Sequence, residues 1–135
     1  MIAIPHRPMN NRRLDQLIRQ ISTSVEGELG FWRFDLHGRQ LLVITDETQN
    51  RMRAMTAIVE ESELTDKDRT LVLDANFDRA LDAKYATSQG HLWSVFTHPL
   101  AELTDDQFTD AAKQVKTLAD NYGTSYASSD LVFGG

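Results

Sequence analysis

The chain has 135 residues, no cysteine and a formal net charge of −6. This length fits one domain with an ordinary core, and the lack of cysteine excludes a disulfide scaffold, Cys-ligated zinc and a thiol nucleophile. No apolar run approaches the roughly 18 residues of a membrane span, and Pro5, His6 and Arg7 interrupt the N-terminus before a signal-peptide core could form. We therefore expect a cytoplasmic protein.

The negative charge is concentrated in residues 60–110, which contain twelve acidic and four basic side chains, whereas residues 1–20 are net positive. An acidic body repels nucleic acids and anionic membranes, so we expect neither as a partner. A basic or mixed polypeptide is a better partner on this ground. Solubility alone explains the acidity equally well.

A helix is expected near the N-terminus. Residues 1–10 show no apolar periodicity and are expected to form a flexible lead, after which Asn10 or Asn11 can cap the helix. Its apolar stripe has helical spacing and consists of Leu14, Leu17, Ile18, Ile21 and Val25. Gly27 and Gly30 are expected to end it.

Three strands are expected next. Phe31–Leu36 alternates between its two faces, and His37-Gly38 is a tight-turn signal. Gln40–Thr45 follows and is apolar on both faces at 41–44, as in a central strand or one covered by a partner. Arg51–Val59 fits either a helix or a strand. We favour the strand, because two hairpin strands need a third to make a stable sheet.

The second half of the chain begins with a short helix, which Thr65 caps and which should finish by Arg79. A hairpin then pairs Leu81–Ser88 with His91–His98 across a Gln89-Gly90 turn. Because only hairpin connections are short, the sheet should be antiparallel.

The last helix has the clearest signals. Thr104 and Gln107 form a capping box at its start, and Gly123 is placed to end it. The predicted class is α+β, in the order α-β-β-β-α-β-β-α, with the helices packed mainly on one face of an antiparallel sheet. We expect one domain over 11–123 and a flexible tail over 124–135.

No group of residues predicts catalysis. The four histidines His6, His37, His91 and His98 have no metal-ligand spacing. Paired acidic residues fall in helix first turns, where the helix dipole explains them. There is no phosphate-binding glycine loop and no organised nucleophile. We therefore expect no metal, no cofactor and no enzymatic activity.

Large apolar side chains exceed what one sheet face with helices on a single side must bury. They are Trp32, Phe34, Leu41–Ile44, Met52, Met55, Trp93 and Phe96, besides two amphipathic helices. A well-filled core is one explanation. The other is that the uncovered sheet face and one helix flank form an interaction surface, for which methionines are suited by their flexibility.

Two segments carry a family resemblance. Leu71–Phe77 ends in Ala-Asn-Phe, and His98–Thr104 places a polar-Pro-Leu link before the final helix. These segments, and the element order over residues 11–123, resemble the type III secretion chaperone family of the Tir-chaperone class. The YbjN-type sensory-transduction regulators, which share the fold, fit almost as well.

The resemblance implies a homodimer without enzymatic activity that holds an extended segment of a client protein, such as a secreted effector, on hydrophobic patches and strand edges. The implied client contacts are Leu14, Leu17, Ile21, Leu41, Val43, Met52, Met55 and Ile58. The implied dimer contacts are Val72, Phe77, Tyr85, Trp93 and Val95. The alternatives are a YbjN-type regulator without a secretion client and an α+β domain that binds a small molecule in a pocket between sheet and helices.

Overall fold

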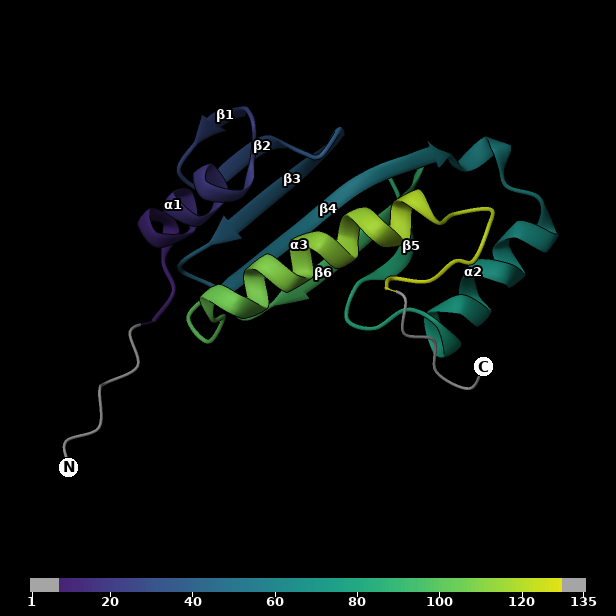
Figure 1. Ribbon diagram of the computed structural model, residues 1–135. Helices are drawn as coiled ribbons and strands as arrows, with labels where there is room; N and C mark the ends of the chain where they lie inside the picture. The colour runs from purple at the N-terminus through teal and green to yellow at the C-terminus, as the bar shows by residue number, and fades with distance from the viewer. Residues whose placement is uncertain (1–7, 130–135) are drawn as a thin grey trace.

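The computed structural model describes residues 8–129, and residues 1–7 and 130–135 lie outside the described part (Figure 1). Its elements are α1 (Asn11–Ile21), β1 (Val25–Glu28), β2 (Phe31–Leu36), β3 (Arg39–Asp46), β4 (Arg51–Glu60), the 3-10 helix η1 (Glu61–Glu63), α2 (Asp66–Asp78), β5 (Lys84–Ser88), β6 (His91–His98) and α3 (Asp105–Asp120). The strands form one antiparallel sheet in the order β1-β2-β3-β4-β6-β5. The predicted fold class is confirmed.

The ambiguous segment after residue 50 is strand β4, as favoured from the sequence. It lies in the interior of the sheet between β3 and β6. Every second residue of β4 faces the helices and is buried: Met52, Ala54 and Thr56. The segment therefore follows the period-two spacing of a strand and not the spacing of a helix.

Strand β1 was not predicted, and the expected extension of the first helix through Val25 is wrong. The helix ends at Ile21, and the Ser22 hydroxyl donates to the Ile18 carbonyl at 2.7 Å. The chain then pairs with β2. Gly27 adopts φ +108°, and a Cβ there would lie 2.2 Å from the Phe31 carbonyl oxygen, so this glycine permits the close backbone approach.

Two other element boundaries differ from expectation. Strand β5 begins at Lys84 rather than Leu81, because other groups hold the preceding N–H groups: Leu81 donates to Ser128 Oγ at 2.8 Å, and Asp82 donates to Gln114 Oε1 at 2.8 Å. Helix α3 ends at Asp120, before the predicted Gly123.

The core lies between one face of the sheet and helices α1 and α3, which are drawn in front of the strands in Figure 1. The largest fully buried side chains include Trp32, Phe34, Phe108, Leu14 and Ile18. The Trp32 indole N–H donates to Asp15 at 3.0 Å and so fastens α1 to β2.

Both ends of the described chain are packed. Met9 is buried, and its N–H donates to the Ala101 carbonyl at 3.1 Å. Tyr126, Ala127 and Ser128 are also buried. The expected lead and tail thus include packed residues, at position 9 and at 126–128, and their flexibility stays a prediction; positions 1–7 and 130–135 lie outside the described residues.

Helix α2 lies beside the edge strand β5, at one end of the molecule (Figure 1). The Asn76 side chain accepts from the Tyr85 N–H at 2.7 Å and donates to the Tyr85 carbonyl at 3.0 Å. A side-chain amide thus occupies both backbone groups that Tyr85 would offer a further strand. This edge of the sheet is closed at Tyr85.

Candidate functional site

The described chain places no helix over the sheet face opposite α1 and α3. On this face the strand register aligns apolar residues of four strands: Phe31 pairs with Ile44, and Leu42 pairs with Met55, which pairs with Val95. Directly paired residues of antiparallel strands project to the same side. With Trp93, these residues form what we call the outer band (Phe31, Leu42, Ile44, Met55, Trp93 and Val95).

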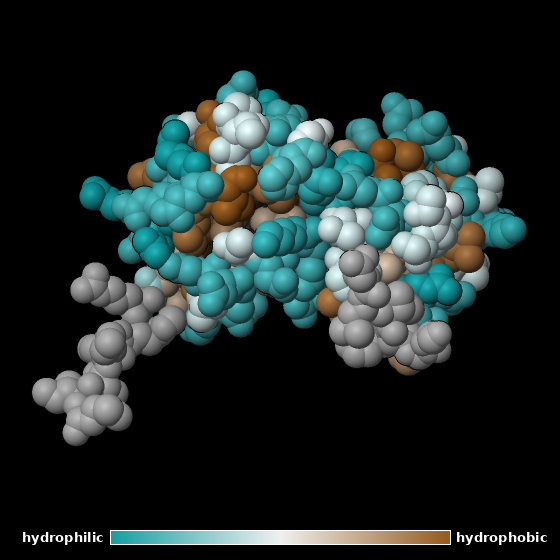
Figure 2. All heavy atoms as spheres, viewed as in Figure 1, coloured by the Kyte–Doolittle hydropathy of each residue, from teal (hydrophilic) through white to brown (hydrophobic). Residues whose placement is uncertain are grey.

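The outer band is partly open to solvent. Phe31 is 41% exposed and Ile44 is 36% exposed, while Met55 and Val95 are half-buried among their neighbours. The opposite, helix-covered side differs: in Figure 2 its surface is mostly hydrophilic over α3, and hydrophobic residues reach it in small separate areas. The continuous apolar surface built by strand register is therefore on the helix-free face.

Exposed arginines are interspersed with the outer band. Arg33 pairs in register with Leu42, and Arg53 pairs with both Ile44 and Thr97. Arg51, at the start of β4, pairs with Asp46. Within residues 8–129, none of these three guanidinium groups lies within ion-pair distance of a carboxylate.

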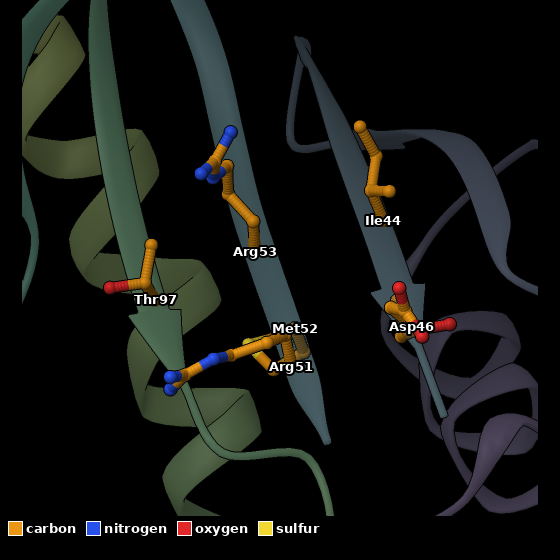
Figure 3. Close-up of a pocket in the computed structure, with 7 residues that line it drawn as sticks. Ile44, Asp46, Arg51, Met52, Arg53 and Thr97 are labelled. Atoms are coloured by element: carbon orange, nitrogen blue, oxygen red, sulfur yellow. The ribbon is translucent and has the colours of Figure 1, made fainter. Parts of the chain in front are cut away.

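A hollow of about 470 Å³ lies where Ile44 of the outer band meets Arg51 and Arg53, and Met52 also lines it. Figure 3 shows Arg51 and Arg53 projecting from β4 beside Ile44 of β3 and Thr97 of β6. The hollow is a shallow surface feature. It does not lie between sheet and helices, which is where the small-molecule alternative placed its pocket.

A second apolar surface lies on α2. Leu73 is 67% exposed and Phe77 is 89% exposed, and their i, i+4 spacing puts both on the same side of the helix. We call this pair the α2 patch. Beside it, a small groove between α2 and β5 is lined by Val72, Leu73, Ala86 and Thr87, so the apolar surface continues from the helix toward the sheet edge.

The residues expected to contact a client are mostly inside the protein. Five of them are buried in the core: Leu14, Leu17, Leu41, Val43 and Met52. This burial leaves Leu14, Leu17, Leu41 and Val43 almost no surface to offer a client, while Met52, although buried, lines the hollow described above. Ile21, Met55 and Ile58 are half-buried, and of these only Met55 belongs to the outer band.

On β3 the residues named as client contacts are the inward-facing ones. Leu41 and Val43 face the helices, whereas Leu42 and Ile44 face outward. Sequence analysis found residues 41–44 apolar on both faces but had no means to choose between them. The signal that would have helped was Phe31, which alternates with the buried Trp32 and so shares its face with Arg33.

The expected dimer residues divide among three places. Val72 and Tyr85 are buried, and the Tyr85 hydroxyl donates to the Leu118 carbonyl at 2.8 Å. Burial raises the pKa of this phenol, with a smaller contribution from the neighbouring tyrosines. Phe77 belongs to the α2 patch, and Trp93 and Val95 belong to the outer band. Val72 and Tyr85 thus expose only a small part of their surface, at the groove between α2 and β5, and their dimer contact stays a prediction.

The other sheet edge is β1, which pairs only with β2. Its strand residues Glu26, Gly27 and Glu28 are exposed, and Leu29 in the following turn is 54% exposed. Since Asn76 closes β5 at Tyr85, β1 is the edge better placed to accept another strand.

Among residues 8–129, no three His, Asp or Glu side chains are grouped so as to hold a metal ion. Nor is any helix in that part of the chain long and apolar enough to cross a membrane.

This chain resembles a known protein in its structure but not in its sequence. No family model and no curated protein matches the sequence. A chain in the structure of the HopA1-SchA chaperone-effector complex matches with a TM-score of 0.61 and 10% identity, covering 81% of this chain and 88% of that one. The two chains share a fold. At this identity the likeness does not establish a common family.

Proposed function

We propose that this protein is a non-enzymatic cytoplasmic chaperone or regulator that binds a segment of a client protein. The observation that carries the proposal is the outer band, an apolar surface that crosses four strands on a face without a helix. Contiguous exposed apolar surface of this kind is typical of protein-binding sites. The fold shared with a chain of a chaperone-effector complex supports the same role.

The geometry suggests how a client would bind. Strands β3 and β4 are interior, so their backbone groups are already paired and only their outward side chains can contact a client. An extended client segment that needs backbone hydrogen bonds would pair with the free edge at β1. Side-chain contact on the outer band and strand addition at β1 would together hold one continuous segment.

A photo-crosslinking residue at position 44 tests this function, with position 113 on the exposed surface of α3 as the control. We expect one polypeptide to be crosslinked from position 44 and not from position 113, and Met55→Asp in the same chain to abolish the product. Equal yields at both positions, or a product that survives Met55→Asp, would refute the proposal. A neighbouring gene that encodes the captured polypeptide as a secreted effector would favour a secretion chaperone over a YbjN-type regulator.

The α2 patch supports a homodimer. Two apolar side chains on one side of a helix gain most by covering the same pair in a second copy, since a twofold contact is self-complementary. We expect sedimentation to show a dimer at micromolar concentration and Phe77→Asp to convert it to a monomer. Asp74→Ala on the same helix is the matched control and should stay dimeric. A wild-type protein that sediments as a monomer would contradict this part of the proposal.

A further inference from the structure

We propose that the client segment on the outer band is acidic as well as apolar, with its carboxylates bound by Arg33, Arg51 and Arg53. This inference rests on the function proposed above and names the chemistry of the partner.

The arginines lie within the apolar surface. Leu42 and Ile44 are consecutive outward residues of β3; Arg33 pairs with the first on one side and Arg53 with the second on the other. Strands are spaced by about 4.8 Å and rise about 3.4 Å per residue, so the backbones of Arg33 and Arg53, two strands and two residues apart, are separated by about 12 Å. A segment that covers this part of the band must pass both guanidinium groups.

Within residues 8–129 these arginines have no ion-pair partner, although that part of the chain contains many acids. Four other arginines form ion pairs: Arg13 with Asp105, Arg19 with Asp15, Arg39 with Asp120, and Arg69 with Glu61. On the helix-free face, no described carboxylate lies within ion-pair distance of Arg33, Arg51 or Arg53.

The acids that share this face do not satisfy the arginines. Glu26 stands opposite Arg33 and Asp46 stands opposite Arg51, yet neither forms an ion pair with it. Asp46 accepts from the Gln49 N–H at 2.9 Å instead, as Asp35 accepts from Gly38 at 3.2 Å. The remaining acids of the face, Glu28 and Glu60, lie in the terminal positions of β1 and β4.

The chain has a net charge of −6, and five acidic residues share this face, but Arg33 and Arg53 are the charges that directly flank Leu42 and Ile44. Salt screens exposed charges over about 8 Å at physiological ionic strength, so a segment bound over these two residues senses the adjacent guanidinium groups more than the acidic helices of the other side. A bound segment that excludes water strengthens hydrogen bonds between guanidinium and carboxylate, which are often bidentate. The whole-chain charge favoured a basic or mixed partner. The arrangement of this face favours an acidic one.

Fluorescent peptides test the proposal directly. Three peptides of about twelve residues have the same alternating leucine and valine positions, with glutamate, glutamine or lysine between them, so that they match the strand period. Their affinities are measured by fluorescence anisotropy for the wild-type full chain and three variants. The variants are Arg33→Gln/Arg53→Gln, Met55→Asp, and a control, Arg12→Gln/Lys113→Gln, which removes two exposed cations from the helix side.

We expect the glutamate peptide to bind at least about tenfold more tightly than the lysine peptide, which corresponds to roughly 1.4 kcal/mol. Arg33→Gln/Arg53→Gln should remove this preference and leave the glutamine peptide unaffected, whereas the control should preserve it. Because the substituted arginines are exposed, these variants should fold, which circular dichroism checks.

Each of the other outcomes refutes either the acidic preference alone or the client-binding function as well. If Met55→Asp abolishes binding but glutamate and lysine peptides bind alike, the acidic preference is overturned and the client-binding function stands. If Met55→Asp has no effect on any peptide, the outer band is not the binding surface and both proposals fail. If a single-stranded RNA of similar length binds through the same arginines more tightly than the glutamate peptide, the partner is a nucleic acid and the inference is overturned.

Discussion

Replacement of Asn76 by alanine is expected to open the β5 edge of the sheet. The substitution removes a hydrogen bond of 2.7 Å to the Tyr85 N–H and one of 3.0 Å to its carbonyl. Each partly buried hydrogen bond contributes about 0.5–1.5 kcal/mol net, so the free energy of unfolding should fall by about 1–3 kcal/mol. The contact between the Asn76 backbone carbonyl and Lys84 is unaffected, because it does not use the side chain.

Urea unfolding followed by circular dichroism measures this loss, and Asp74→Ala, an exposed site on the same helix, is the control. The opened edge should also increase self-association, since Tyr85 then presents an unpaired N–H and carbonyl beside β5. Sedimentation at several concentrations detects this. An Asn76→Ala protein within about 0.5 kcal/mol of both wild type and the control would refute the reasoning, since the two hydrogen bonds together should contribute at least about 1 kcal/mol.

Asn76→Asp adds a pH test of the same contact. Aspartate can still accept from the Tyr85 N–H, but its second oxygen then faces the Tyr85 carbonyl. This repulsion raises the pKa of the carboxyl in the folded state, because the protonated form can donate to that carbonyl. The variant should therefore be destabilised relative to wild type at neutral pH and recover part of the difference as the pH falls through the raised folded pKa toward the unfolded value near 4. A deficit that is independent of pH would show that the amide does not act through this bond.

Three further predictions concern stability. Gln114→Leu should lower the free energy of unfolding by about 2–4 kcal/mol in urea, because Oε1 of this buried residue accepts from the N–H groups of 82–83 and leucine would leave both unpaired. Ser94→Ala should be neutral or stabilising by up to about 1 kcal/mol in thermal unfolding, because the buried Ser94 Oγ has no hydrogen-bond partner among the described residues; a clear loss of stability would contradict this. The hydrogen bond from Arg13 lowers the pKa of Asp105, so the stability it adds is present above the unfolded pKa near 4 and is lost as the pH falls through the folded value. The stability advantage of wild type over Asp105→Asn should accordingly shrink between about pH 5 and pH 2 in acid titrations, and a constant difference would contradict this.

The last three residues of Leu71–Phe77 have different surroundings in the structure. Ala75 is buried, Asn76 holds the backbone of Tyr85, and Phe77 is almost fully exposed. Ala75 thus packs the helix against the core, Asn76 closes the sheet edge at Tyr85, and Phe77 exposes an apolar side chain. The sequence showed the motif, but it did not indicate which task each residue performs.

The sequence by itself determined the local features of the structure, such as helix caps and tight turns. Thr104 Oγ accepts from the Gln107 N–H at 3.1 Å, and Gln107 in turn accepts from the Thr104 N–H, as the capping box predicted. The turns His37-Gly38 and Gln89-Gly90 adopt the positive φ that tight hairpins need. Such features depend on residues within four positions of one another, so the sequence pattern is enough to predict them.

Tertiary structure alone decided which residues the protein presents to a partner. A strand with apolar residues on both faces, such as Leu41–Ile44, has no local property that selects its inner side. That choice depends on pairing with β2 and β4 and on burial by distant helices. For the same reason the alignment of Arg33 and Arg53 around β3 and the closure of β5 by Asn76 were hidden in the sequence: each joins residues of different elements, which only the assembled sheet brings together.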